Sequence, residues 1–352
     1  MPYYTPLRYP GGKRRLATTI MRLLDANDLT DVEYCEPYAG GAAIGLALLM
    51  EEYASVIHIN DLDRAVYAFW YSVLNDTTEL CRRIARTKVT MREWKRQRKI
   101  YELRETADLT ELGFATLFLN RTNRSGILSG GVIGGKNQTG EWGIDARFGK
   151  PELIHRIRKI GRYRSRINLY QQDALEFTKR VIPNIGANRF AFYDPPYIEN
   201  GAELYLNDYD IKGHRQLADT VSKLSGAWVV TYDYSAVRHK LYRSHRRIAY
   251  GLQYMAQGRY EGKEVMFLSK GLRLPQTWSK MLPVPMSAES SGHPVYGMIE
   301  DMKPHPKMVE GPEAGERFVN ALRTVLSVPK SSIPQPFHKP AKKSKRSVTR
   351  KG

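Results

Sequence analysis

Apolar and polar positions along the first two-thirds of the chain follow two periods, one typical of strands and one typical of helices. Short strand-like runs are expected over 32–37, 55–61, 166–173, 189–194 and 227–233. Helix-like segments are expected over 41–52, 63–74 and 212–224. Strands separated by helices in this way predict a parallel, doubly wound α/β sheet. A late strand over 263–270 is expected to pair as a hairpin with 242–250.

The alternation of strands and helices stops between residues 75 and 164. A basic helical region containing Trp94 and Tyr101 comes first, and a glycine-rich stretch follows it, with eight glycines over residues 126–149. A loop of this length inside a compact domain is usually functional. We therefore expect residues 75–164 to form an inserted lobe in a core made of residues 1–74 and 165–271.

The composition changes again after residue 271. Residues 272–311 are proline-rich and are expected to be a linker. Phe318, Leu322 and Val325 have helical spacing, which predicts a short amphipathic helix over 312–328. Residues 329–352 are basic with little to bury, and are expected to be a disordered tail.

The net charge of the chain limits the classes of partner that it is expected to bind. A formal net charge of +19 over 352 residues favours a polyanion, most commonly nucleic acid, over a merely solubilising basic surface. Two cysteines are too few for a disulfide framework or a cysteine-rich zinc site. The chain shows neither a secretion signal nor an apolar run near the roughly 20 residues that span a bilayer. A cytoplasmic protein without a membrane partner is expected.

A glycine-rich stretch, "EPYAGGAAIG", follows the first expected strand and opens a helix. Glycines there let a ligand approach the N–H groups of a helix N-terminus. Asp61 ends the next strand, where an acid can accept both hydroxyls of a ribose. The combination indicates a nucleoside-containing cofactor. Tight helix–strand packing, with Asp61 as a helix cap, is the alternative.

Two further motifs flank this pattern. "RYPGGK", residues 8–13, lacks the spacing of a phosphate-binding P-loop, and by itself it indicates an N-terminal turn. "FYDPPY" ends the expected strand over 189–194 with a carboxylate, two prolines that fix φ, and an aromatic ring. Asp194 and the Pro195 carbonyl could accept both protons of an aryl amine, and Tyr197 could stack on the base. A base reaches such a pocket only by flipping out of its duplex. A turn with a capping aspartate is the alternative.

Taken together, "YPGGK", "EPYAGG" and "DPPY", in this order, resemble the motifs of the Dam-like D12 class of DNA adenine-N6 methyltransferases. The resemblance runs from about Leu7 to Lys270. It implies a Rossmann-like methyltransferase sheet with an inserted DNA-recognition lobe, and S-adenosylmethionine (SAM) as cofactor. Double-stranded DNA is the implied substrate, and no metal is needed because SAM brings its own leaving group.

The resemblance also assigns residues to roles. The implied catalytic residues are Asp194, Pro195, Pro196 and Tyr197. The implied cofactor-binding residues are Tyr9, Lys13, Glu36, Gly40, Asp61, Asp173 and Asp194. The implied DNA-binding residues are Asn120, Arg121, Arg124 and Lys136, the first two matching the family's Leu-Asn-Arg before a DNA-contacting hairpin.

Two departures from the family pattern stand out. Ala42 replaces a common glycine, and an alanine fits there when its φ is negative. In the hairpin, Arg124 and Ser129 stand where GATC-specific members have an aromatic residue and an arginine, so GATC specificity is not implied.

Alternatives from other classes stay open at this point. One is methylation of RNA adenine or cytosine N4, and another is a DNA-binding relative without catalysis. A bacterial or phage source is expected, and a cognate restriction nuclease is a conceivable partner that the sequence does not decide.

Overall fold

The computed structural model describes residues 3–8, 14–196, 211–233, 241–254, 260–275 and 278. Contacts divide the chain into units 1–287 and 288–352, and every described residue belongs to the first. The expected helix over 312–328, the expected tail, and the site candidates Tyr9, Lys13 and Tyr197 lie outside the described residues.

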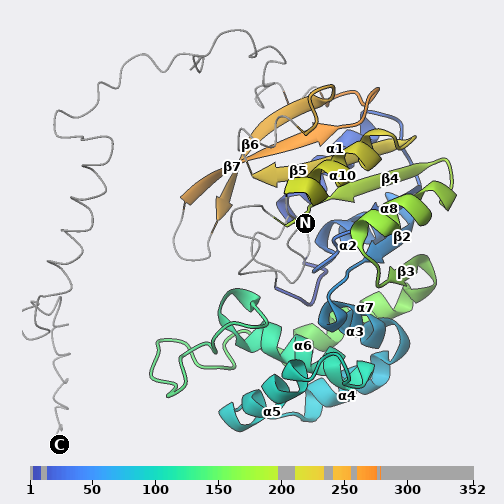
Figure 1. The fold of residues 1–352 in the computed structure, drawn as a ribbon. Helices are drawn as coiled ribbons and strands as arrows, with labels where there is room; N and C mark the ends of the chain where they lie inside the picture. Colours follow the sequence, from blue (N-terminus) through green and yellow to red (C-terminus); the bar gives the residue numbers. More distant parts are fainter. Residues whose placement is uncertain are drawn as a thin grey trace, which may run out of the picture. The chain divides into compact units, whose positions relative to one another are not determined.

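The described strands form one sheet in the order β3-β2-β1-β4-β5-β7-β6 (Figure 1). Neighbours among the first five strands pair in parallel, and β7 is antiparallel to both β5 and β6. The strands are β1 (Val32–Glu36), β2 (Ala54–Asn60), β3 (Ile167–Tyr170), β4 (Arg189–Tyr193), β5 (Ala227–Asp233), β6 (Arg246–Tyr254) and β7 (Tyr260–Leu268). The predicted parallel sheet and late hairpin are confirmed, with β6 and β7 as an antiparallel edge.

Both faces of the sheet are covered, because side chains along each strand alternate between two apolar clusters. In β4, Phe190 and Phe192 pack in the cluster that includes residues of α1 (Arg14–Asp25) and α2 (Ala43–Met50). Ala191 and Tyr193 pack in the other cluster, with residues of α8 (Ala174–Arg180) and α10 (Ile211–Ser222). The core is therefore a three-layer α/β fold.

The segment between β2 and β3 is helical in the described structure. It contains α3 (Arg64–Asn75), α4 (Thr77–Arg86), α5 (Met91–Glu102), α6 (Leu109–Thr122) and α7 (Lys150–Arg162), with short 3₁₀ turns η1 (Arg124–Gly126) and η2 (Arg164–Arg166). Helix α6 packs on α3 and α5, and α7 packs on α4. Figure 1 shows this group away from the β6–β7 hairpin. Its role as a recognition lobe stays a prediction.

Local capping explains where these helices begin. The Asp63 side chain accepts from the N–H of Ala65 at the start of α3, and the Thr90 hydroxyl accepts from the N–H of Glu93 at the start of α5. Asp108 caps α6 in the same way. Each side chain satisfies helix N–H groups that have no partner within the helix.

The N-terminal segment 3–8 is fastened to the helical group by Asn120. The Asn120 Oδ1 accepts from the N–H of Arg8 at 2.7 Å, and Nδ2 donates to the Arg8 carbonyl at 2.7 Å and the Gly126 carbonyl at 2.9 Å. Gly126 has a φ of +80°, and a Cβ there would lie 2.4 Å from the Arg8 carbonyl oxygen. Only glycine fits this crossing of two backbones.

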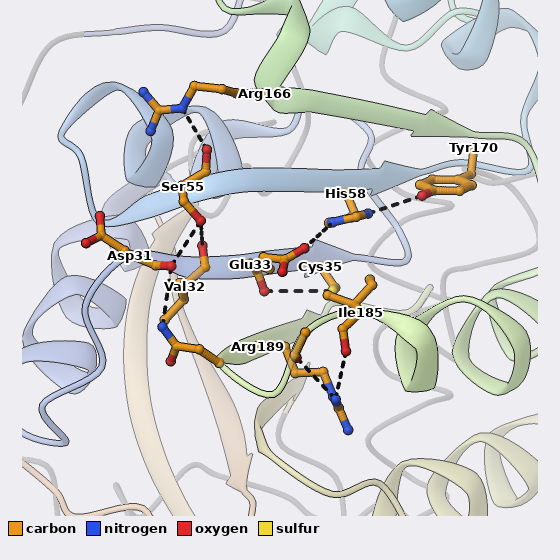
Figure 2. A network of polar contacts seen from close by, with 12 residues as sticks. Asp31, Val32, Glu33, Cys35, Ser55, His58, Arg166, Tyr170, Ile185 and Arg189 are labelled. Atoms are coloured by element: carbon orange, nitrogen blue, oxygen red, sulfur yellow. Dashed lines mark hydrogen bonds and ion pairs between the residues drawn. The ribbon is translucent and has the colours of Figure 1, made fainter.

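A second polar network crosses the sheet between β1, β2 and β3 (Figure 2). His58 contacts the Glu33 carboxylate through Nε2 and the Tyr170 hydroxyl through Nδ1, both at 3.2 Å. Burial lowers the pKa of His58, and Glu33 opposes that shift. Burial raises the pKa of the neighbouring Cys35 thiol to about 12, so this thiol stays protonated and unreactive. This network ties strands together and contains none of the predicted site residues.

The backbone at Ala42 corrects one expectation. Its φ is +46° and its ψ is +36°, so this alanine is in the left-handed region immediately before α2. Alanine would replace glycine here without strain only at a negative φ, and the φ of Ala42 is positive. An L-residue in this conformation costs about 1–2 kcal/mol, and the site's glycine turn therefore carries local strain.

We predict that Ala42→Gly raises the free energy of unfolding by up to about 1 kcal/mol, because glycine adopts a positive φ without a Cβ clash. The matched control is Ala47→Gly, in the interior of α2, which should lower the free energy of unfolding by about 1 kcal/mol. Urea unfolding of both variants measures the difference. Equal losses in the two variants would mean that Ala42 is not strained.

Candidate active site at the carboxyl edge of the sheet

Three acidic side chains meet where three adjacent parallel strands end. Glu36 is the last residue of β1, Asp61 follows β2 directly, and Asp194 follows β4 directly. The strand β1 lies between the other two in the sheet. The chain leaves β1 toward β2 on one side and reaches β4 on the other, which is the switch point where open α/β sheets bind ligands.

Glu36 is the most enclosed of the three acids. It is 6% exposed, and its Oε2 is buried without a hydrogen-bond partner among the described residues. Burial raises the pKa of Glu36 well above its ordinary value, and the charges of Asp194 and Asp61 raise it further, while the Gly45 N–H of α2 opposes the shift. The Gly45 N–H and the Tyr34 hydroxyl only partly offset this burial, so a ligand group that donates or is positively charged would stabilise the charged form of Glu36.

Asp61 organises the glycine turn. Its Oδ2 accepts from the N–H of Gly40 at 2.9 Å, and its Oδ1 accepts from the N–H of Asp63 at 3.0 Å. Burial, followed by the charge of Asp63, raises the pKa of Asp61 to about 7. The cap of α3 is Asp63, not Asp61. Each carboxylate oxygen can accept a second hydrogen bond, so the fixed carboxylate can still receive a ribose hydroxyl.

Two side chains that the sequence did not single out stabilise the glycine turn by hydrogen bonds. Trp70 Nε1 donates to the Gly40 carbonyl at 2.9 Å. Asn60 is fully buried; its Nδ2 donates to the Pro37 and Gln172 carbonyls, and its Oδ1 accepts from the Gln172 N–H. Asn60 thereby joins the loops after β1 and β3. A polar residue at the end of the apolar run "SVIHIN" is the signal that could have indicated it.

Asp194 is half-buried and is held by the next strand. The Thr231 hydroxyl of β5 lies 2.9 Å from Asp194 Oδ1 and 3.2 Å from the Tyr193 carbonyl, as donor to either. Pro195 and Pro196 are buried directly after it. Thr231 was also missed in the sequence, although it is a polar residue inside the apolar run "AWVVTYD". The carboxylate is thus oriented by a buried hydroxyl before a rigid turn.

Asp173 lies at the same edge of the sheet, and its carboxylate caps the helix that follows it. Its Oδ1 accepts from the N–H groups of Leu175 and Glu176, which caps α8. Its predicted contact with a cofactor adenine stays a prediction. The structure therefore brings together Glu36, Gly40, Asp61 and Asp194 among the predicted cofactor residues.

The predicted DNA-binding residues lie at and beyond the end of α6. Asn120 is 2% exposed and, as described above, fastens Arg8 and Gly126. The half-buried Arg121 donates from Nε to the Arg147 carbonyl at 2.6 Å. Arg124 is exposed on the loop that a bridge between Asn123 and Val132 closes, and Lys136 is exposed shortly after Val132. DNA contact by all four stays a prediction, and Asn120 has a positioning role in this structure.

Two other features bear on the site. No group of three or more His, Cys, Asp or Glu side chains within the described ranges is arranged to hold a metal ion. No described helix has the length and apolarity that crossing a membrane requires.

The sheet order and the acidic switch point define a Rossmann-like fold that can hold a nucleoside-containing cofactor. Residues 9–255 match the D12 class of N6 adenine-specific DNA methyltransferases. The match covers more than half of the chain, and the protein belongs to this family of SAM-dependent methyltransferases.

Solved structures give weaker likenesses. A provisionally assigned RNA methyltransferase from Pyrococcus horikoshii is 8% identical, with a TM-score of 0.36 over 76% of this chain and 87% of that one. A provisionally assigned methyltransferase from Escherichia coli is 10% identical, with a TM-score of 0.29 over 73% and 86%. No curated protein matches by sequence. With TM-scores this low, the assignment depends on the family and the topology.

The acidic edge fits SAM on chemical grounds. SAM carries a sulfonium and an ammonium group against one carboxylate, and a cation offsets both the burial of these carboxylates and the repulsion of Glu36 by Asp194 and Asp61. A cofactor with a pyrophosphate would add negative charge to the same acids. The buried Glu36 carboxylate is an acceptor for the donors of such a cationic ligand.

Thr231→Val should lower kcat for methyl transfer about 10–100-fold, because an isosteric side chain without the hydroxyl releases the Asp194 carboxylate from a hydrogen bond worth about 1.5–3 kcal/mol. The KM for SAM should change little, and Thr231→Ser should restore most of the rate. Steady-state kinetics with the three proteins test this. Wild-type turnover by Thr231→Val would show that Asp194 needs no support from β5.

Proposed function

We propose that this protein is a site-specific DNA methyltransferase that moves a methyl group from SAM to N6 of an adenine flipped out of its duplex. The observation that carries the proposal is the placement of Asp194 and Pro195 beside Glu36 and Asp61 at one sheet edge. The acids proposed to bind the cofactor and the turn proposed to bind the amine then lie in one site.

The cofactor supplies an electrophilic methyl group on a sulfonium sulfur. The task of the protein is to hold that group and the amine in line, because positioning removes much of the barrier to a displacement. Asp61 is proposed to receive the ribose hydroxyls, and Glu36 is proposed to face the positively charged part of the cofactor. Gly40, with a φ of +46°, lets the ligand approach the turn closely.

Asp194 and Pro195 are proposed to act on the amine. An adenine amino group is a poor nucleophile because its lone pair is delocalised into the ring. Hydrogen bonds from its two N–H groups to the Asp194 carboxylate and the Pro195 carbonyl localise the lone pair on N6. Once the N6–methyl bond has formed, the surplus N6 proton leaves by way of the Asp194 carboxylate to solvent. The Asp194 carboxylate also stabilises the positive charge that develops on N6, and Tyr197 is proposed to stack on the flipped base.

The inserted lobe is proposed to hold the duplex and read its sequence. Arg124 and Lys136 are exposed on the loop that follows α6, where they are available to phosphates or base edges. A strongly basic chain predicts affinity that falls steeply with salt. A restriction nuclease acting at the same site would be a natural partner of such an enzyme, and its presence is a separate proposal.

Asp194→Ala should lower methyl transfer at least about 10³-fold while the protein stays folded, because the variant loses the principal acceptor for the amine. The assay uses labelled SAM with one sequence as duplex DNA and as duplex RNA. Asp219→Ala, an exposed acid of α10, is the matched control and should keep full activity. Transfer by Asp194→Ala at the control rate would refute the mechanism, and transfer to RNA alone would refute the substrate.

The binding of SAM should depend on pH through Asp61. With a pKa of about 7, this carboxyl is mostly protonated at pH 6 and mostly charged at pH 8, and only the charged form accepts two ribose hydroxyls. The Kd of Asp61→Asn relative to that of the wild type should therefore grow about tenfold from pH 6 to pH 8.

Calorimetry at the two pH values measures this ratio. The amino group of SAM titrates near this range, but its effect is common to both proteins and cancels in the ratio. A ratio that stays constant with pH would remove Asp61 from the cofactor site.

A further inference from the structure

Four arginines gather where the N-terminal segment meets the end of α6 and the start of α7. We call Arg8, Arg121, Arg147 and Arg156 the arginine cluster. Arg8 is bonded through its backbone to Asn120, the neighbour of Arg121. Arg121 Nε donates to the Arg147 carbonyl at 2.6 Å, and Arg156 Nη1 donates to the Thr5 carbonyl at 3.1 Å. These bonds hold the Arg121 and Arg156 side chains beside the backbone of Arg147 and of the N-terminal segment, and the charges of Arg8, Arg147 and Arg156 all act on Arg121.

The cluster has little negative charge to balance it. Arg156 pairs with the exposed Glu152 at 2.7 Å. The other three arginines make no ion pair with any acid that the structure describes. Arg8 Nη1 is buried and has no hydrogen-bond partner in the described part of the chain. A buried guanidinium nitrogen without an acceptor indicates that an acceptor binds there.

Gathering these charges is unfavourable for the protein alone. Burial lowers the pKa of Arg121 to about 10, and the charges of Arg8, Arg156 and Arg147 contribute to the decrease. Burial, followed by the charge of Arg147, also lowers the pKa of Arg8. An anion bound among these side chains would reverse both effects, since guanidinium groups bind phosphate oxygens with paired N–H donors.

We propose that the arginine cluster binds one phosphodiester of the DNA backbone, an inference that rests on the proposed DNA substrate. Arg121 is in the last turn of α6, directly before the loop that carries Arg124 and Lys136. A phosphate held here sets the register of the duplex against that loop. Phosphate contacts position a duplex and do not read its bases, so the cluster contributes affinity without sequence preference.

The position of the cluster adds a second consequence. Asn120 joins the Arg8 backbone to the Gly126 carbonyl at the start of the same loop. The backbone that carries the Arg8 guanidinium and the start of the loop are therefore held by one buried side chain. The bound phosphate and the base-reading loop keep a fixed separation, which is what register requires.

The test compares full-length Arg121→Gln and Arg147→Gln with Arg180→Gln. Arg180 is an exposed arginine of α8, so the control removes the same charge outside the cluster. Binding of two unrelated 20-base-pair duplexes is measured by fluorescence anisotropy between 50 and 200 mM salt. Each cluster variant should bind both duplexes roughly tenfold more weakly, with a slope of log K against log salt that is smaller by about 0.9. Arg180→Gln should match the wild type.

The outcomes separate this inference from the proposed function. Wild-type slopes in both cluster variants, in a protein that methylates DNA, would overturn the phosphate site and leave the function standing. Reduced slopes in a protein that methylates no DNA would support the phosphate site and refute the function. Weakening for one duplex only would make the cluster a base reader and contradict the proposal. Arg147 is exposed, so its variant stays informative even where Arg121→Gln lowers the melting temperature.

Discussion

The burial of carboxyl groups at the ends of neighbouring strands is the constraint on which the site depends. Parallel strands bring Glu36, Asp61 and Asp194 to one edge, where burial and the charges of the other two acids disfavour the ionisation of Glu36. Burial is the main cause of the raised pKa values of Glu36 and Asp61; the charges of Asp194 and Asp61 add to the shift of Glu36, and the charge of Asp63 adds to that of Asp61. A cationic cofactor offsets these shifts, so the arrangement favours SAM over a phosphate-rich nucleotide.

The surroundings of this edge keep the acids in place. Asn60 joins the loops after β1 and β3, Trp70 holds the Gly40 carbonyl, and Thr231 orients Asp194 from β5. The left-handed Ala42 indicates that the turn keeps its shape even without the usual glycine. At the helical group the charge is reversed, because Arg156 is the one member of the arginine cluster that pairs with a described acid. The protein thus has an acidic sheet edge, proposed to bind a cationic cofactor, and a basic cluster, proposed to bind DNA.

Much of this could be predicted from the sequence, for identifiable reasons. The strands were visible because buried parallel strands are continuous apolar runs, and the acids were visible because each one ends such a run. Thr231 and Asn60 were missed because a single buried polar residue in a strand has no pattern until its neighbour in the sheet is known. The arginine cluster brings together residues 8, 121, 147 and 156, and no sequence spacing brings these positions together. The positive φ of Ala42 could not be predicted from the sequence pattern either.

The central claim is that one edge of the sheet methylates N6 of adenine in DNA at a defined sequence. Single-molecule sequencing of DNA from cells expressing the protein reports the modified base, the atom and the surrounding sequence together. The account predicts N6-methyladenine at one recurrent motif, absent from cells that express Asp194→Ala. Unmodified DNA in cells containing the folded wild-type protein, or methylation on cytosine, would contradict it.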